Sequence, residues 1–371
     1  MKKLNKFMTA TIVAAAVASA TASACTSFVI NSEDGAVVYG RTMEWGAFDV
    51  NSRLAISPRG HVYTGTAPDG KQALTYSNKY GFVAMDAVLQ DLAVDGMNEK
   101  GLVVGALYHP GAAEFPEYNP LDANSTISTQ ALANYMLGQF ATVEEVAEGL
   151  KDVTVIMQKE EKFGNSEIPI HWTVVDANND RIVVEYLNGE LTVFDNPIGV
   201  MTNSPSFDWH MNNLSNYLYL QQQERGSITL NGVDIKPTGG GTGLLGVPGD
   251  FTPPSRFVRA VAYTQIARDT KDGADAVNEA FRILDGFQLP VGASEGGAIS
   301  ADYLKYAQAA TTWTTTADAT NLKYYYHTQF DRQVRMIDLN KIDFSNTGEG
   351  IQYLELDKTR TQSVVDVTPS I

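Results

Sequence analysis

The first half of the chain contains short stretches in which apolar residues either alternate with polar residues or run together, a pattern typical of β-strands. Residues 26–31 (TSFVIN) and 36–43 (AVVYGRTM) flank the turn signal Ser32-Glu33-Asp34-Gly35. Further strands are predicted at 53–57, 81–85, 101–107, 168–175 and 181–187, the last two around Asn178-Asn179-Asp180. Because neighbouring strands joined by short turns pair antiparallel, the pattern predicts antiparallel sheet.

Apolar residues spaced three and four apart predict helices in other parts of the chain. These helices are expected at 128–140, 142–150, 207–220, 255–268 and 273–285. The second begins with Thr142, followed three residues later by Glu145, which is a capping box. Strands return between about 313 and 344, where Tyr324, Tyr325 and Tyr326 are expected to alternate between core and surface. The polar residues after about 346 are expected to form an arm or an edge strand.

Strands in neighbouring pairs and helices in pairs indicate an α+β protein whose antiparallel sheets are layered against helices. No repeat, low-complexity linker or change of composition divides the chain, so residues 25–371 are predicted to form a single domain. Hydrophobic residues make up 44% of the 371 residues and charged residues 19%, the composition of a soluble globular protein with a large core.

The first 24 residues have the features of a signal peptide. Three lysines among the first six residues precede the apolar stretch 12–18 (IVAAAVA), and Ala22-Ser23-Ala24 matches the small-x-small cleavage rule. The apolar stretch is far shorter than the roughly 20 residues of a spanning helix, and no later stretch reaches that length. We therefore expect export from a bacterial cytoplasm to the periplasm, with no stable membrane insertion after cleavage.

The charge of the chain argues against two classes of partner. The chain carries 27 basic and 43 acidic residues, a net charge of −16. Without residues 1–24, which hold three lysines and no acid, 24 basic residues face 43 acidic ones, for a net charge of −19. So acidic a surface disfavours nucleic acids and anionic membranes as partners.

The chain has one cysteine, Cys25, which directly follows the predicted cleavage site, so no internal disulfide can form. A lipid-anchored lipoprotein is one interpretation, but Ala22 stands where the lipobox usually has leucine. An inert leftover thiol is another, although a free thiol is a liability in an oxidising compartment. The third interpretation is an N-terminal nucleophile.

An N-terminal cysteine carries a thiol and a free α-amine on the same residue. In model peptides these groups titrate at about 8.5 and about 7.7–8.0, so a proton passes readily between them near neutral pH. One residue then supplies both nucleophile and general base, and no histidine partner is needed. This chemistry explains why an enzyme would place its only cysteine at this position.

The sequence contains no pattern for a metal or cofactor. Five histidines are present, at His61, His109, His171, His210 and His327. No two have metal-binding spacing and no cysteine cluster exists, so each is interpreted as a surface or packing residue and no metal is predicted. The glycine-rich stretch 239–246 lacks a following Gly-Lys-Ser/Thr, so it is not a P-loop, and no cofactor is predicted.

Six motifs, in order along the chain, resemble the choloylglycine hydrolase family, which includes conjugated bile salt hydrolases and penicillin V acylases. They are Cys25-Thr26-Ser27-Phe28, Gly40-Arg41-Thr42-Met43-Glu44-Trp45, Asp95-Gly96-Met97-Asn98-Glu99-Lys100-Gly101-Leu102, Met201-Thr202-Asn203-Ser204-Pro205, Gly246-Val247-Pro248-Gly249-Asp250 and Pro254-Ser255-Arg256-Phe257. The resemblance extends from Cys25 to about residue 345. It implies the N-terminal nucleophile hydrolase fold, a four-layer αββα sandwich of two antiparallel sheets between helical layers.

The resemblance also implies roles for four residues. Cys25 would attack an amide carbonyl, and Arg41 would lie near its sulfur, where a fixed cation favours the thiolate. Asn203 would donate its side-chain amide to the developing oxyanion, and Arg256 would hold the charge network together. Taken singly, Arg41 and Arg256 would be interpreted as surface ion pairs and Asn203 as a turn residue. The ordered set of motifs favours the site roles.

Two positions depart from the family pattern. Glu44 stands where aspartate is usual, so the carboxylate that orients the α-amine of Cys25 is longer by one methylene. Tyr108, in Leu107-Tyr108-His109, resembles penicillin V acylases, whereas bile salt hydrolases resemble Leu-Asn-Phe there. Its backbone amide would be the second oxyanion donor, and its ring, together with Trp45, would shape a pocket for an aromatic or fatty acyl group.

The resulting hypothesis is an exported cysteine amidohydrolase, similar to penicillin V acylase, that forms a thioester on Cys25. Within this class the alternatives are N-acyl homoserine lactone acylase, a quorum-quenching activity, and conjugated bile salt hydrolase. The alternative from another class is a lipid-anchored, non-catalytic binding lipoprotein. The family resemblance also implies a homotetramer.

Overall fold

The computed structural model describes residues 25–46, 50–160, 166–293, 309–345 and 350–369. The predicted signal peptide at 1–24 therefore lies outside the described residues. Within the described part of the chain, no helix is both long enough and apolar enough to span a bilayer.

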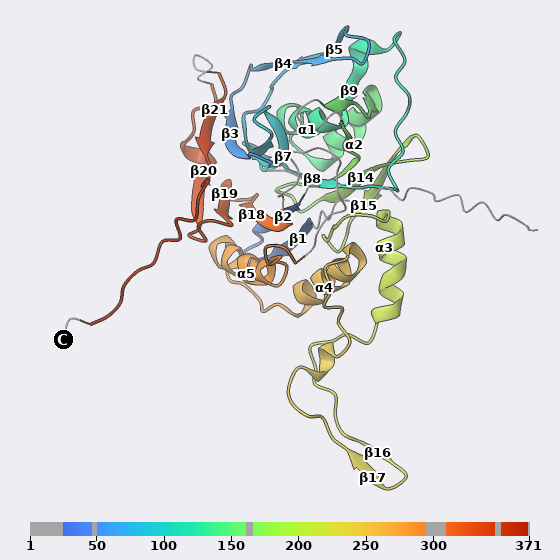
Figure 1. Cartoon of the computed structure of the whole chain (residues 1–371), viewed down its shortest axis with the longest axis vertical. Coiled ribbons are helices and arrows are strands. Elements are labelled where there is room, and N and C mark those ends of the chain that lie inside the picture. The colour runs from blue at the N-terminus through green and yellow to red at the C-terminus, as the bar shows by residue number, and fades with distance from the viewer. Residues whose placement is uncertain (1–24, 47–49, 161–165, 294–308, 346–349, 370–371) are drawn as a thin grey trace, which may run out of the picture.

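Two antiparallel sheets form the centre of the molecule (Figure 1). The five-stranded sheet has the order β1 (Thr26–Asn31), β2 (Val37–Trp45), β18 (Ala310–Asp318), β19 (Lys323–Thr328) and β20 (Arg335–Asp338). The eight-stranded sheet has the order β15 (Glu190–Asp195), β14 (Arg181–Leu187), β13 (Ile170–Val175), β8 (Val103–Tyr108), β7 (Leu92–Asn98), β6 (Phe82–Ala87), β3 (Arg53–Ser57) and β21 (Gln352–Glu355). Each is assembled from chain segments far apart in sequence.

Helices cover the outer face of each sheet (Figure 1). On the eight-stranded sheet, α1 (Leu132–Gln139) packs against β7 and β8, and α2 (Val143–Gly149) follows it. On the five-stranded sheet, α4 (Pro253–Ile266) packs against β1, and α5 (Gly273–Asp285) packs against β2 and β18. The predicted αββα sandwich is confirmed.

Two hydrophobic cores follow from this layering. One core holds inward-facing residues of both sheets together with those of α4 and α5, and the other lies between the eight-stranded sheet and α1. On α4, Phe257 is fully buried. Burying one such side chain contributes about 1.5–3 kcal/mol. This packing holds α4, and the arginine next to Phe257, firmly against β1.

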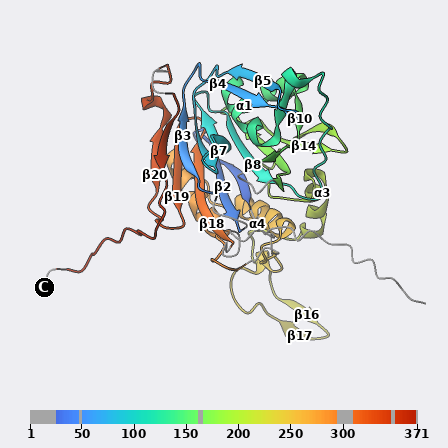
Figure 2. The same ribbon diagram turned by 45° about the horizontal axis from the view of Figure 1, so that its top comes forward.

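Short strand pairs lie outside the two main sheets. They are the hairpin β4 (Val62–Thr66) with β5 (Gln72–Ser77), the parallel pair β9 (Thr126–Ser128) with β10 (Thr154–Ile156), β11 (Lys159–Glu160) with β12 (Ser166–Glu167), and the hairpin β16 (Ile228–Leu230) with β17 (Val233–Ile235). Figures 1 and 2 both show the β16–β17 hairpin projecting away from the body. The C-terminal residues also leave the body as an extended segment.

Most element predictions are confirmed, several with their boundaries. β1, β3 and α5 coincide with the predicted ranges, and Thr142 caps α2 by accepting a hydrogen bond from the Glu145 N–H at 3.2 Å. Tyr324 and Tyr326 are buried, while Tyr325 between them is partly exposed. β21 is an edge strand that pairs with β3.

Three predictions were wrong or incomplete. The helix expected at 128–140 begins only at Leu132, because residues 126–128 pair with β10 as strand β9. The helix expected at 207–220 is α3 (Phe207–Asn213), followed by a 3-10 turn over Leu214–Tyr217. Strands β7 and β15 of the eight-stranded sheet were not predicted, and neither were the short strands β4, β5, β9, β10, β11, β12, β16 and β17. β7 contains polar Asp95 in its middle, and only partners from other strands make this residue acceptable in a core.

Candidate active site

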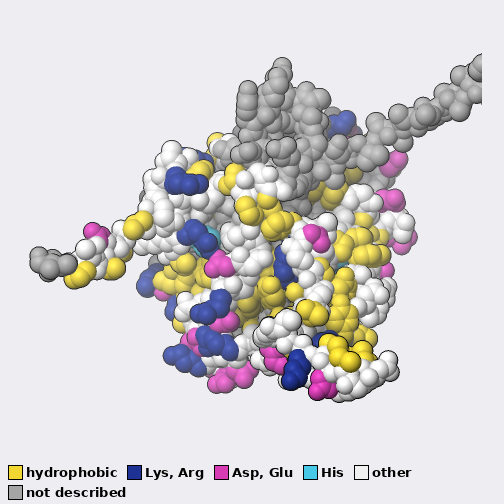
Figure 3. Space-filling model, turned by 60° about the horizontal axis from the view of Figure 1, so that its bottom comes forward, with side chains coloured by type: hydrophobic (Ala, Val, Ile, Leu, Met, Phe, Trp, Pro, Cys, Tyr) yellow, Lys and Arg dark blue, Asp and Glu magenta, His cyan; other side chains and the backbone are white. Residues whose placement is uncertain are grey.

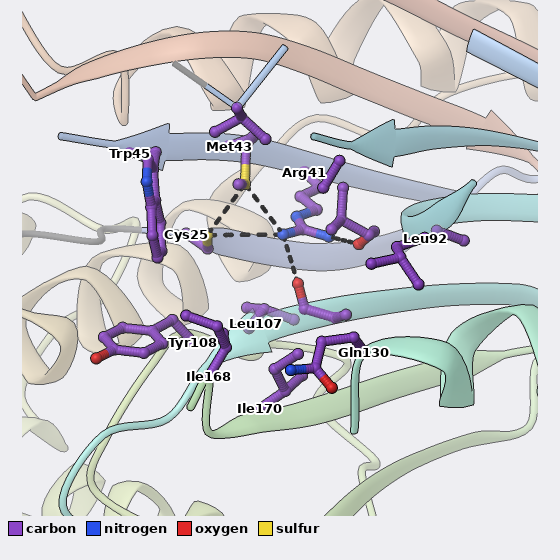
Figure 4. Close-up of a pocket in the computed structure, with 15 residues that line it drawn as sticks. Cys25, Arg41, Met43, Trp45, Leu92, Leu107, Tyr108, Gln130, Ile168 and Ile170 are labelled. Carbon is purple, nitrogen blue, oxygen red and sulfur yellow. Dashed lines mark hydrogen bonds between the residues drawn. The ribbon is translucent and has the colours of Figure 1, made fainter. Parts of the chain in front are cut away.

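The candidate nucleophile Cys25 directly precedes β1 and is buried. Because Thr26 pairs with Thr42, the β1–β2 register continues to place Cys25 opposite Met43, with both side chains on the face that carries Arg41. The Sγ atom of Cys25 lies 3.7 Å from Sδ of Met43 and 3.6 Å from Nη2 of Arg41 (Figure 4). The pairing of two strands thus brings the sulfur and the guanidinium into contact.

Arg41 is fully buried and is held by backbone carbonyls of the facing sheet. Its Nη2 donates to the carbonyl of Ala106 at 2.6 Å, and its Nη1 donates to the carbonyl of Val94. Burial by itself would lower the pKa of Arg41, but the charges of Cys25, Tyr39 and Asp95 outweigh it and raise that pKa. Arg41 is therefore a permanent cation, and interpreting it as a surface ion pair was wrong.

Asp95 on β7 is the carboxylate nearest to this cation, with Oδ1 3.6 Å from Nη1 of Arg41. It accepts hydrogen bonds from the hydroxyls of Tyr39 at 3.1 Å, Thr315 at 2.8 Å and Tyr324 at 2.5 Å. Burial raises the pKa of Asp95, opposed first by the charge of Arg41 and then by these donors. Sequence reasoning quoted Asp95 only as part of a motif. A carboxylate inside a strand, followed by Gly96, was the signal that it could have used.

Arg256, in the first turns of α4, joins the candidate nucleophile to Asn203. The N-cap residue Thr252 and the prolines after it begin α4 so that Arg256 points at β1. Its Nη1 donates to the carbonyl of Cys25 and, at 2.9 Å, to Oγ1 of Thr26. Its Nη2 donates to Oδ1 of Asn203 at 2.6 Å. Burial lowers the pKa of Arg256 to about 10, and Glu44 opposes that change.

The side chain of Asn203 lies against the backbone of Tyr108. Nδ2 of Asn203 donates to the carbonyl of Tyr108 at 2.8 Å. The N–H of His109 pairs with the carbonyl of Pro169 on the β13 side. Since successive residues of a strand direct their backbone groups to opposite edges, the N–H and carbonyl of Tyr108 both point away from β13. The structure therefore brings the backbone of Tyr108 to the same place as the Asn203 amide.

Glu44 lies on the opposite face of β2 from the Cys25 thiol, because side chains alternate along a strand. It is fully buried and accepts hydrogen bonds from Thr42 at 3.1 Å and Thr311 at 2.8 Å. Burial raises the pKa of Glu44 to about 7, against the opposing charge of Arg256. Glu44 follows Met43 on β2, and the β1–β2 register puts Met43 opposite Cys25, so Glu44 lies close to the backbone of Cys25.

A mostly apolar pocket opens beside the sulfur (Figure 4). The rings of Trp45 and Tyr108 meet edge-to-face, with centroids 5.6 Å apart, on one side of Cys25. Leu92 and Gln130 lie at the far end, beyond Arg41. The walls between them are formed by Met43, Val50, Ala87, Ala93, Val94, Ala106, Leu107, Ile168 and Ile170. An apolar group bound here would lie next to the sulfur.

Three of the five histidines form a buried cluster. His109 directly follows β8, and His171 is on β13. Because β8 and β13 are neighbouring strands, the two rings stack with their centroids 4.0 Å apart. With Glu185 they are the one group of potential metal ligands found among the described residues. His210 lies nearby and bonds the carbonyl of Asn203. Sequence spacing could not reveal this cluster, because strand pairing and not local spacing brings its members together.

Comparisons with known proteins agree with this geometry. Residues 25–353 match the model of the "Linear amide C-N hydrolases, choloylglycine hydrolase family". The bile salt hydrolase/transferase of Clostridium perfringens is 32% identical over 340 residues, covering 90% of this chain and 98% of that protein. The penicillin V acylase of Pectobacterium atrosepticum is 29% identical, covering 96% of this chain and 93% of that protein.

Solved structures resemble the whole sandwich. A variant of the conjugated bile acid hydrolase of Clostridium perfringens superposes with a TM-score of 0.78 at 30% identity, covering 93% of this chain and 100% of that chain. The penicillin V acylase of Agrobacterium tumefaciens superposes with a TM-score of 0.70 at 26% identity, covering 91% and 93%.

Proposed function

The chain belongs to the choloylglycine hydrolase family of linear amide C–N hydrolases, and from this premise we propose that it is an exported cysteine amidohydrolase whose nucleophile is Cys25. One observation carries the proposal. The only sulfhydryl of the chain lies 3.6 Å from a buried, permanently charged guanidinium at the edge of an apolar pocket. Such an arrangement favours a thiolate next to a bound acyl group.

Removal of residues 1–24 would convert the backbone nitrogen of Cys25 into an α-amine. The amine takes the thiol proton, and the sulfur attacks the amide carbonyl of the substrate. The amine then returns the proton to the leaving nitrogen, which departs as a free amine and leaves a thioester on Cys25. Water, activated by the same amine, cleaves the thioester and releases the carboxylic acid.

Two donors stabilise the oxyanion in this scheme. An amide nitrogen carries two N–H groups, so Asn203 can bond Tyr108 with one and the oxyanion with the other. The backbone N–H of Tyr108 is the second donor, supported by its orientation away from β13. A donor of this kind contributes about 10²–10³-fold in kcat. Arg256 fixes the position of Asn203 relative to Cys25, because it donates hydrogen bonds to both residues.

Glu44 orients the new α-amine. In the uncleaved chain this carboxyl is buried, and burial raises its pKa to about 7. A newly formed ammonium beside it would favour the carboxylate through charge pairing. The longer side chain of glutamate, compared with the aspartate usual in the family, reaches the amine from the face opposite to the sulfur.

The proposed substrate has an aromatic or fatty acyl group, as in penicillin V. The edge-to-face pair of Trp45 and Tyr108 supports this assignment, because aromatic rings prefer such offset contacts. The second candidate is an N-acyl homoserine lactone, whose hydrolysis would be quorum quenching. It is favoured by the extension of the pocket to Leu92 and Gln130, which gives length for an acyl chain. Conjugated bile salts are the third, from the named activity of the clostridial relative.

Phenoxyacetate release from penicillin V by the purified mature protein, with and without prior iodoacetamide, tests the proposal. We expect release that iodoacetamide stops, and a Cys25→Ser variant with little or no activity, because a hydroxyl needs a stronger base than a thiol does. Full activity in that variant would refute the nucleophile. The intact mass of the exported protein tests processing. A mass that corresponds to cleavage before Cys25, with nothing added, supports the proposed processing. A mass increased by a diacylglyceryl group would support the lipoprotein alternative and exclude release into the periplasm.

We also propose that the protein assembles into a homotetramer through the β16–β17 hairpin. Ile228, Leu230, Val233 and Ile235 are 49–60% exposed, and Figure 3, in which this end comes forward, shows hydrophobic side chains at the surface. A two-stranded hairpin with no core of its own is only marginally stable in water. Packing against other copies would cover these side chains.

A further inference from the structure

The short segment from Thr202 to Phe207, which carries Asn203, runs from the loop after β15 into the first residue of α3. Its start is tied to β1 by two hydrogen bonds between Ser27 and Met201, of 2.8 and 2.9 Å. Beyond this bridge, no strand partner holds Asn203 in the described structure. A loop is more mobile than the elements it connects, and a misplacement of about 1 Å can cost about 10²-fold in rate. Arg256 holds the side-chain oxygen of Asn203, so the backbone of this segment needs anchors of its own if Asn203 is to act as a donor.

Buried ionisable side chains bond the backbone of this segment at three points. Nε2 of His171 bonds the carbonyl of Thr202 at 2.9 Å, and Nε2 of His210 bonds the carbonyl of Asn203 at 2.8 Å. Both carboxylate oxygens of Glu185 accept from the N–H of Phe207, at 3.1 and 3.2 Å. The backbone on both sides of Asn203 is thus anchored to β13, β14 and α3.

Glu185 also fixes the tautomer of His171. Because a carbonyl can only accept, Nε2 of His171 must carry a proton to bond Thr202. Nδ1 of the same ring lies 3.0 Å from Oε1 of Glu185, so one more proton lies between these two atoms. Burial raises the pKa of Glu185 and lowers the pKa of His171 to about 3, which favours the neutral pair in which Glu185 donates. Removing this carboxyl leaves Nδ1 buried without its partner.

The same cluster is poorly built for a metal ion. Histidine binds a metal along a lone pair in the plane of its ring. The rings of His109 and His171 are stacked, with centroids 4.0 Å apart and an interplanar angle of 18°, so their lone pairs lie in two separate, nearly parallel planes and do not share a point between the rings. Nε2 of His109 lies 3.8 Å from Oε1 of Glu185. The cluster is therefore a hydrogen-bond network that acts on the neighbouring loop.

We propose that Glu185, His171 and His210 are positioning residues that hold the Thr202–Phe207 segment, and thereby place the Asn203 amide for the developing oxyanion. The inference rests on the proposed role of Asn203 as oxyanion donor. None of these three residues touches the sulfur or lines the apolar pocket in the described structure. Their contribution passes entirely through the backbone of the loop.

The test compares Glu185→Met with Glu185→Gln in the mature protein. Glutamine keeps a donor for Nδ1 of His171 and an acceptor for Phe207, whereas methionine has a similar size and neither group. In Glu185→Met we expect kcat to fall by about 10–100-fold, approaching loss of an oxyanion donor, with KM changed by less than about threefold. Glu185→Gln should stay within about threefold of the wild-type kcat. Alkylation of Cys25 by iodoacetamide, which forms no oxyanion, should remain within about twofold in both variants.

Glu279→Met is the matched control, because Glu279 is a buried glutamate on α5 that pairs with Arg268 away from the sulfur. Its kcat should remain at the wild-type value. An unchanged kcat in Glu185→Met, or an equal fall in Glu185→Gln, would overturn the inference. An alkylation rate that falls together with kcat would also overturn it, because the effect would then not be specific to Asn203.

A double-mutant cycle separates this inference from the proposed function. In an Asn203→Ala background, Glu185→Met should lower kcat by less than about threefold further, since residues acting through one group are non-additive. A full additional loss would overturn the inference. A normal kcat in Asn203→Ala alone would overturn both the oxyanion assignment and the inference, whereas a low kcat there with a normal Glu185→Met would overturn only the inference.

If Glu185→Met does not fold, His210→Phe provides the same test. The phenyl ring keeps the stack on Phe257, whose centroid is 4.6 Å away, but loses the bond to the Asn203 carbonyl. We expect at least about a tenfold fall in kcat with unchanged alkylation. A wild-type kcat in this folded variant would overturn the inference.

Discussion

Replacing Arg41 by methionine tests the electrostatic premise of the site. The guanidinium lies 3.6 Å from the Cys25 sulfur. With an effective dielectric constant of about 20, unit charges at this separation attract by about 5 kcal/mol. Asp95, also 3.6 Å from the guanidinium, offsets part of this attraction. Hydrogen bonds to charged groups contribute about 1.5–3 kcal/mol in measured series, so we expect the thiolate to be disfavoured by that amount.

The assay is the second-order rate constant for alkylation of Cys25 by iodoacetamide at pH 7. An energy of about 1.5–3 kcal/mol corresponds to a rate about 10–100-fold lower in Arg41→Met. The variant also leaves Asp95 as a buried charge without its partner, which costs about 3–5 kcal/mol of stability. The double variant Arg41→Met with Asp95→Asn removes both charges. It should be more stable than the single variant Arg41→Met, and its Cys25 should be alkylated as slowly as in that variant.

Arg53→Met is the control for loss of a largely buried arginine. Arg53 pairs with Asp86 at 2.6 Å and stacks on Tyr353 at 3.8 Å, away from the sulfur. Its alkylation rate should equal that of the wild type. Wild-type alkylation in a folded Arg41→Met variant would refute the reasoning, and so would an equal loss in Arg53→Met.

Three further predictions concern stability and assembly. Because burial raises the pKa of Glu44 from 4.5 to about 7, the folded uncleaved chain keeps this proton longer than the unfolded chain. The free energy of unfolding should therefore fall as pH rises from 4.5 to 7 in urea titrations, and Glu44→Gln should flatten that slope; an unchanged slope would contradict this. A Cβ on Gly105 would lie 2.3 Å from the Tyr39 hydroxyl that bonds Asp95, so Gly105→Ala should cost about 1–3 kcal/mol of stability. Gly226→Ala, which meets nothing within 4 Å, is the control, and equal melting temperatures would contradict the prediction. Replacing Leu230 and Val233 by serine should lower the molar mass measured by light scattering without unfolding the sandwich, and an unchanged mass would exclude the hairpin as the interface.

The sequence by itself determined the local elements and the identity of the candidate nucleophile. Strand β1 and helix α5 were predicted with their boundaries, because alternation, caps such as Thr142 and turn residues act over only a few positions. A lone cysteine directly after a small-x-small site pointed to Cys25. The ordered motifs that contain Arg41 and Asn203 then indicated the family and the layered fold.

Only the tertiary structure decided how buried charges are balanced. The sequence analysis predicted no strand around Asp95, but β2, β18 and β19 bring three hydroxyls and Arg41 to it, and so make a buried carboxylate tolerable. Strand pairing between β8 and β13 stacked His109 on His171, residues more than sixty positions apart in sequence. Local patterns report on neighbours along the chain, whereas the pairing of β8 with β13 and of β1 with β2 chooses neighbours in space. Most of the network around Asn203 could therefore not be predicted from the sequence, because the contacts of His171 and Glu185 with this segment are long-range; only the bond from His210 to Asn203 is local.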